Sequence, residues 1–83
     1  MLSFEFDNKQ TCVVIHLDVN GVDFLIERLA RLKKSNVNEH EHLMSKEWGG
    51  SELDTIDASI SEHDEPINHV KIFYWEELPF EIK

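Results

Sequence analysis

Hydrophobic and polar residues alternate with a period of two at the start of the chain. Leu2, Phe4 and Phe6 are separated by polar or acidic residues, a pattern typical of a strand with one buried face. Residues 7–10 then supply turn formers, and residues 11–17 are β-branched and apolar on both faces. Such a run is typical of a central strand that is covered on both sides. The two segments together predict a β-hairpin.

A helix is predicted over residues 18–35. Asn20 is suited to cap its N-terminus, with Asp18 as the alternative. Cations gather towards its C-terminal end, where they complement the helix dipole. Apolar residues recur at helical spacing and predict one buried stripe, made by Val22, Leu25, Ile26, Leu29 and Leu32.

Two further strands are predicted in the second half of the chain. Residues 40–45 alternate, so that His40, His42 and Met44 share one face. Residues 67–75 form a strongly β-prone run. One face of that run carries His69, Lys71, Phe73 and Trp75, and the other carries Val70, Ile72 and Tyr74.

The segment between these strands divides into a glycine turn and an acidic stretch. Gly49-Gly50 predicts a turn, because glycine adopts positive φ or lets another backbone approach closely. Residues 51–60 suit a loop or a short helical turn equally well. Residues 57–66 hold almost no large apolar side chain and are expected to form an exposed connection.

The order β-β-α-β-β predicts a single α+β domain over residues 1–83. We expect a mostly antiparallel four-stranded sheet with one helix packed on one face. One helix covers only one face of the sheet. The second face of the sheet is therefore expected to be partly apolar and to form an interface, either in a homodimer or with a protein partner. The side chains expected on that face are Cys12, Val14 and His16, with Phe73 and Trp75.

The charge of the chain narrows the range of partners. Seventeen acidic and eight basic side chains give a net charge of −9. Nucleic acid is therefore not expected as a partner, since its binding depends on Lys and Arg. An acidic surface suits solubility, or steering towards a basic protein partner. No apolar run approaches the roughly 18–20 residues that span a bilayer, and Cys12 is expected to be a buried thiol. The single cysteine and the lack of a signal-peptide pattern predict a cytoplasmic protein.

The sharpest chemical signal is the pair His40-x-His42. Residues i and i+2 of a strand point to the same side, so both imidazoles, with His69 from a paired strand, are candidates for one zinc ion. Glu41 or Glu47 would stand nearby as a carboxylate. The alternative is polar cross-strand contact without a metal. No nucleophile, phosphate-loop or dinucleotide motif is present, so no catalytic residue and no cofactor is predicted.

The segment around these histidines resembles a known family. Residues 40–45, His-Glu-His-Leu-Met-Ser, followed by Glu-Trp-Gly-Gly at 47–50 and Glu-Leu at 52–53, resemble the signature region of the immunity protein 32 family. Residues 68–74 resemble that family's closing strand. The resemblance covers about the C-terminal half. Its distinctive positions are His40, His42, Leu43, Trp48, Gly49, Gly50 and His69.

This resemblance implies a small α+β protein that binds and neutralises a cognate toxin of a bacterial polymorphic toxin system, without chemistry of its own. An acidic domain of this size would suit the basic substrate groove of a nuclease toxin. Trp48 is interpreted either as a plug of the sheet edge or as an anchor for a partner. The expected partner-binding residues are Glu41, Glu47, Trp48, Gly49, Gly50 and Glu52, with His40, His42 and His69.

Overall fold

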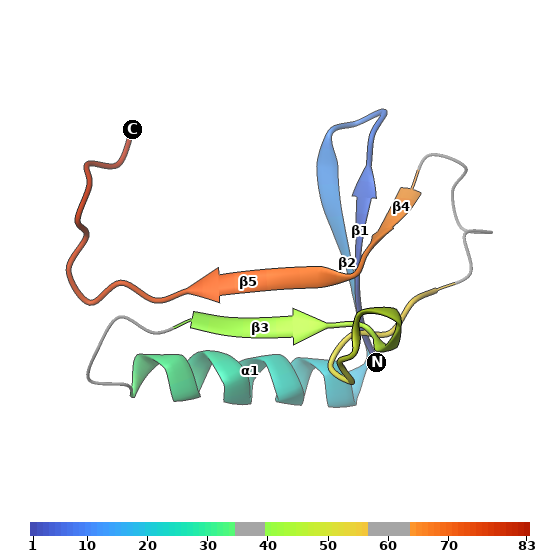
Figure 1. Ribbon diagram of the computed structural model, residues 1–83, viewed down its shortest axis with the longest axis horizontal. Coiled ribbons are helices and arrows are strands. Elements are labelled where there is room, and N and C mark those ends of the chain that lie inside the picture. Colours follow the sequence, from blue (N-terminus) through green and yellow to red (C-terminus); the bar gives the residue numbers. More distant parts are fainter. Residues whose placement is uncertain (35–39, 57–63) are drawn as a thin grey trace.

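The computed structural model describes residues 1–34, 40–56 and 64–83 of the chain. One helix packs with antiparallel strands in an α+β arrangement, which confirms the predicted fold class (Figure 1). The elements in chain order are β1 (Leu2–Asp7), β2 (Cys12–Leu17), α1 (Val19–Lys33), β3 (His40–Met44), a 3₁₀ turn (Lys46–Trp48), β4 (Asp64–Ile67) and β5 (His69–Phe73).

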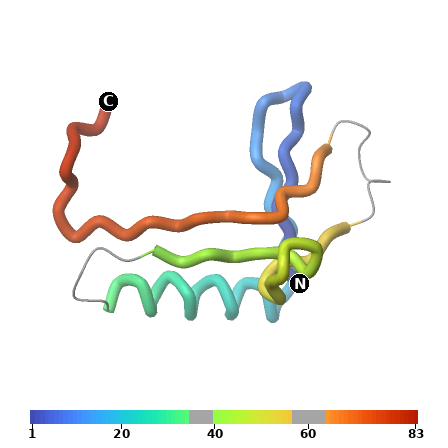
Figure 2. The backbone as a smooth tube through the Cα atoms, in the orientation of Figure 1, coloured from blue at the N-terminus to red at the C-terminus, as the bar shows by residue number. Residues whose placement is uncertain are grey.

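The strands form two sheets in place of the single four-stranded sheet that the sequence predicted. One sheet has the order β2-β1-β4, and the other pairs β3 with β5. The division lies at Asn68, where one extended segment leaves the first sheet and enters the second (Figure 2). Ser45 holds this bend, because its backbone N–H donates to the Asn68 carbonyl (2.9 Å) and its hydroxyl donates to Asn68 Oδ1 (2.7 Å).

Two sequence interpretations are wrong at this bend. Residues 67–75 are not one strand, and residues 64–66 are not a loop but part of β4. Proline in a strand is confined mainly to sheet edges, where its missing donor can face away from the ladder, and Pro66 lies in the edge strand β4. Residues 57–63, the rest of the expected exposed connection, lie outside the described residues.

The central strand of the three-stranded sheet is β1 and not β2. It pairs with β2 from Leu2↔Leu17 to Asp7↔Cys12, and with β4 on its other side. Residues 2–5 of β1 are buried, whereas exposed and half-buried residues alternate along β2. The expectation that the second strand is covered on both sides is therefore wrong, and Cys12 is half-buried.

The helix begins after Asp18, whose carboxylate accepts a hydrogen bond from the Gly21 N–H at 2.8 Å. Asp18 is thus the N-cap, and Asn20 is not. The predicted apolar stripe is only partly turned inwards: Leu32 is buried and Leu25 half-buried. The three remaining members of the stripe lie at the surface, with exposed fractions of 41% for Val22, 59% for Ile26 and 45% for Leu29.

The hydrophobic core lies where α1 meets both sheets. Leu43 of β3 is fully buried within it. The other buried members are Leu2, Phe4 and Leu53, and the side chains packed around them are Phe24, Leu25, Ile67, Val70 and Ile72. The helix and every strand except β2 thus contribute to this core, which explains how so short a chain holds two sheets together.

The turn after β3 uses its two glycines in different ways. Gly49 adopts φ +87°, a conformation that other residues rarely take. At Gly50 a Cβ atom would lie 2.4 Å from the carbonyl oxygen of Met44, so only glycine fits there. That same carbonyl accepts the backbone N–H groups of Glu52 and Leu53. Both predicted uses of glycine are therefore found, one at each position.

Candidate functional site

The two-stranded sheet has one face towards the helix and one face away from it. β3 pairs antiparallel with β5, and the register places His40 opposite Phe73, and Met44 opposite His69. Directly opposed residues share a face, so the even-numbered residues of β3 stand with the odd-numbered residues of β5. α1 runs alongside β3 (Figure 1). The other face contributes Leu43, Val70 and Ile72 to the core, together with Phe24 and Leu25 of the helix. The predicted division of faces in both strands is confirmed.

The face away from the helix carries a continuous row of rings, which we call the aromatic–histidine face. Neighbouring ring centroids in the row are 4.6–6.1 Å apart, the range of favourable aromatic contact. The row runs in the order Trp48, His69, His42, His40, Phe73, Trp75 and Phe80. The structure thus brings together four of the predicted site residues, the three histidines and Trp48.

The exposure of this row distinguishes it from a core. Trp48 is 59% exposed, Phe73 53% and Trp75 36%. The interpretation of Trp48 as a plug of the sheet edge is therefore wrong, and its role as an anchor for a partner stays a prediction. Large aromatic side chains left open on a small domain are typical of a protein-binding surface.

At the middle of the row, His42 and His69 are joined by a hydrogen bond. His42 Nδ1 lies 2.8 Å from His69 Nε2, so one ring donates and the other accepts, and at least one imidazole of the pair is neutral. His40 meets His42 ring edge to ring face and not through a nitrogen pair. Within residues 1–34, 40–56 and 64–83, no group of three or more His, Cys, Asp or Glu side chains is placed to hold a metal ion. The geometry found is that of stacked, hydrogen-bonded rings.

Glu41 lies on the opposite face, among the side chains that meet the helix. Its Oε2 accepts from Arg28 Nη1 at 3.1 Å, and its Oε1 accepts from Arg31 Nη2 at 3.0 Å and from Nε at 3.2 Å. The Glu41 side chain is only 15% exposed. It therefore fixes α1 to β3, and the structure separates it from the other predicted partner-binding residues.

Two carboxylates stand close to Trp48 in sequence and stay ionised below neutral pH. A hydrogen bond from its own backbone N–H lowers the pKa of Glu47, with help from the hydroxyls of Ser45 and Thr55. The pKa of Glu52 is lowered mainly by the backbone N–H of Ser51, which donates to Oε2 at 2.6 Å. These groups keep negative charge in the turn that carries Trp48.

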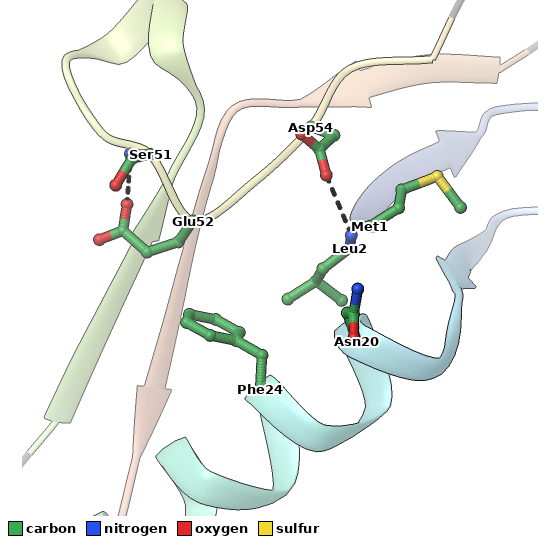
Figure 3. Close-up of a pocket in the computed structure, with 8 residues that line it drawn as sticks. Met1, Leu2, Asn20, Phe24, Ser51, Glu52 and Asp54 are labelled. Carbon is green, nitrogen blue, oxygen red and sulfur yellow. Dashed lines mark hydrogen bonds between the residues drawn. The ribbon is translucent and has the colours of Figure 1, made fainter.

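A shallow pocket of about 240 Å³ lies elsewhere, at the N-terminal end of α1 (Figure 3). Phe24 and Leu2 form its apolar wall. Its carboxylates already have backbone partners, since Asp54 accepts from the Leu2 N–H (3.2 Å) and Glu52 from the Ser51 N–H. Both carboxylates of the pocket lining are thus hydrogen-bonded to the backbone around them.

The histidine pair predicts a pH dependence of stability. Burial lowers the pKa of His42 below its ordinary value of 6.5, and the charges of His40, His69 and Lys71 lower it further. The unfolded chain therefore binds the proton more readily, so stability is complete above about pH 6.5 and falls as the pH decreases towards the folded-state pKa. We expect the melting temperature to decrease between pH 7.5 and pH 5.5.

The melting temperature of His42→Gln should change less over the same range. His16→Gln, which removes a histidine from the other sheet, serves as the control and should retain the decrease that His42 causes. Equal pH profiles for the wild type and His42→Gln would contradict the assignment. Thermal unfolding followed by circular dichroism measures all three proteins.

Sequence reasoning missed part of this site. Lys71, Phe73 and Trp75 were placed on one strand face but were not assigned to the site of the histidines, and Phe80 was not considered. The alternation in residues 69–75 held the signal, because it aligns these side chains with His69. The alternation does not give the register of the two strands, which places Phe73 opposite His40.

No helix in the described part of the chain has the length and apolar character needed to cross a bilayer. Comparison of this chain with protein-family models, with curated proteins and with solved structures found no match.

Proposed function

We propose that the protein is a non-enzymatic binding protein that neutralises a cognate bacterial toxin by covering it with the aromatic–histidine face. The observation that carries the proposal is the open row of rings, in which Trp48 and Phe73 each expose more than half of their surface. Side chains of this kind supply most of the binding energy in protein interfaces. The identity of the partner as a toxin rests on the resemblance of residues 40–53 and 68–74 to the immunity protein 32 family.

The chemistry of the face supports a protein partner over a substrate. Its histidines are engaged with one another and with neighbouring rings. The pocket of about 240 Å³ lies at the N-terminal end of α1 and contains none of these histidines, and its two carboxylates accept backbone hydrogen bonds. Its rings are rigid and already stacked, so little side-chain entropy is lost on binding. The net charge of −9 and the ionised carboxylates of Glu47 and Glu52 favour a basic partner and fast association.

The test is co-expression with the product of the adjacent gene, as the candidate toxin, followed by affinity measurement on the purified pair. We expect the protein to restore growth. Trp48→Ala and Phe73→Ala should each weaken binding by about 2 kcal/mol or more, or roughly 30-fold, because both are exposed anchors. Raising the salt concentration should slow association.

Val22→Ala is the matched control, since Val22 is exposed on α1 and lies outside the face. It should leave both growth and affinity unchanged. A toxin that binds Trp48→Ala and Phe73→Ala as tightly as it binds the wild type would remove the face from the interface. Absence of any binding by the wild-type protein would remove the toxin from the proposal.

A further inference from the structure

The two edges of the three-stranded sheet are built differently. On the β4 edge stand Pro66, which lacks a backbone donor, and the acidic residues Asp64 and Glu65. Proline and charge are the devices by which natural proteins keep edge strands from pairing. The β2 edge has neither, because Cys12–Leu17 contains no proline, lysine, arginine or carboxylate. One edge is protected against another strand, and the other is left able to accept one.

The backbone of β2 can form further hydrogen bonds along its outer edge. Its ladder runs to β1 on one side, and the described backbone hydrogen bonds include none to its other side. Along this strand the apolar side chains remain open, with exposed fractions of 55% for Val13, 46% for Ile15 and 40% for Leu17. An unprotected edge combined with an exposed apolar row is a template for a further strand.

The distribution of charged residues indicates which strand can pair with the open edge of β2. Residues 10–17 are the longest stretch of the chain without Asp, Glu, Lys or Arg. Two copies of a protein with a net charge of −9 repel each other, but two β2 strands can meet without carboxylates of their own opposing each other. From this we propose that β2 pairs antiparallel with β2 of a second copy of this chain, around a two-fold axis, to form a homodimer with one continuous six-stranded sheet.

The geometry of the pairing follows from the strand alternation. An axis perpendicular to the sheet sets residues of the same parity opposite each other, so that Val13, Ile15 and Leu17 of both copies fall on one face. The axis passes between the two copies of either Val14 or Ile15, so that this residue stands opposite its own counterpart. Because both copies use the same edge, assembly stops at two. The dimer leaves the aromatic–histidine face, on the other sheet, open to a different partner.

The first experiment measures mass in solution by light scattering during size-exclusion chromatography. We expect the wild type at twice the 9.8 kDa of the chain, and loss of the dimer in Ile15→Lys, which places a cation on the edge. Val22→Lys is the control, because it adds the same charge to an equally exposed apolar position on α1 and should remain dimeric. A monomeric wild type, or equal masses for the two variants, overturns the proposal.

A second experiment does not depend on disrupting the fold. In a Cys12→Ser background, cysteine is introduced at Val14 or at Ile15, and mild oxidation is applied. The residue on the axis has its Cβ about 4.5–5.5 Å from its counterpart, close enough for a disulfide after a small adjustment. We expect a covalent dimer for one of these two variants and none for Val22→Cys. Cross-linking at Val22 alone, or at none of the three, overturns the proposal.

Discussion

Replacement of Leu43 by alanine is expected to lower the free energy of unfolding by about 2–5 kcal/mol. Among the described residues, Leu43 is the one large apolar side chain with no exposed surface, and it lies where β3 meets the helix and the packed residues of β5. Truncation removes its transfer free energy and leaves a cavity that two sheets and a helix surround, so the site cannot easily collapse. In a domain of 83 residues this loss is a large share of the total stability.

Leu29→Ala is the matched control for this prediction. It makes the same chemical change at a position on α1 that is 45% exposed, and we expect a loss of well under half that of Leu43→Ala. Urea unfolding followed by tryptophan fluorescence gives both values. Similar losses for the two variants would mean that the core is not centred on Leu43.

The second large effect is expected at Gly50. A Cβ atom there would meet the Met44 carbonyl oxygen at 2.4 Å and the Met44 Cβ at 2.6 Å, distances that real structures do not show. Gly50→Ala must therefore displace the backbone of the turn from the end of β3, with loss of the bonds that Glu52 and Leu53 donate to Met44. We expect a loss of about 2–3 kcal/mol in the free energy of unfolding.

Gly49→Ala separates strain from collision at neighbouring positions. Gly49 has no atom within 4 Å of its virtual Cβ, so alanine there meets only the unfavourable φ of +87°, at a cost of about 1 kcal/mol. The expected order of stability is therefore wild type, then Gly49→Ala, then Gly50→Ala. A reversed order, measured by urea unfolding, would show that the turn does not fold back on Met44.

Local patterns in the sequence predicted the elements and their faces. Period-two alternation placed His40 and His42 on one side of β3, and helical spacing located α1 to within two residues at its C-terminal end. These properties depend on neighbours along the chain, and so the sequence holds them directly. For the same reason the sequence predicted that the glycine pair would supply a positive φ or a close backbone approach. It did not predict that Gly49 has the positive φ and Gly50 the close approach.

The arrangement of the strands could not be read in the same way. That β1 is central depends on its pairing with β4, whose Pro66 and acidic residues are typical of a loop. The prediction that the whole apolar stripe of the helix is buried was wrong for a related reason. Val22, Ile26 and Leu29 have the correct spacing, but two sheets that meet crosswise cover less of a helix than one broad sheet would (Figure 1). Tertiary packing decided both cases.

The pairing of β1 with β4 has a consequence for the order of folding. The hairpin of β1 and β2 can form early because its partners are adjacent, but Phe4 must find Ile67 at the other end of the chain. Contacts of such long sequence separation require a large loop to close first, and this slows folding. Both sheets are then completed together at the bend at Asn68, because the segment that adds β4 to the first sheet also adds β5 to the second. The chain should therefore reach its native state in one late, cooperative step.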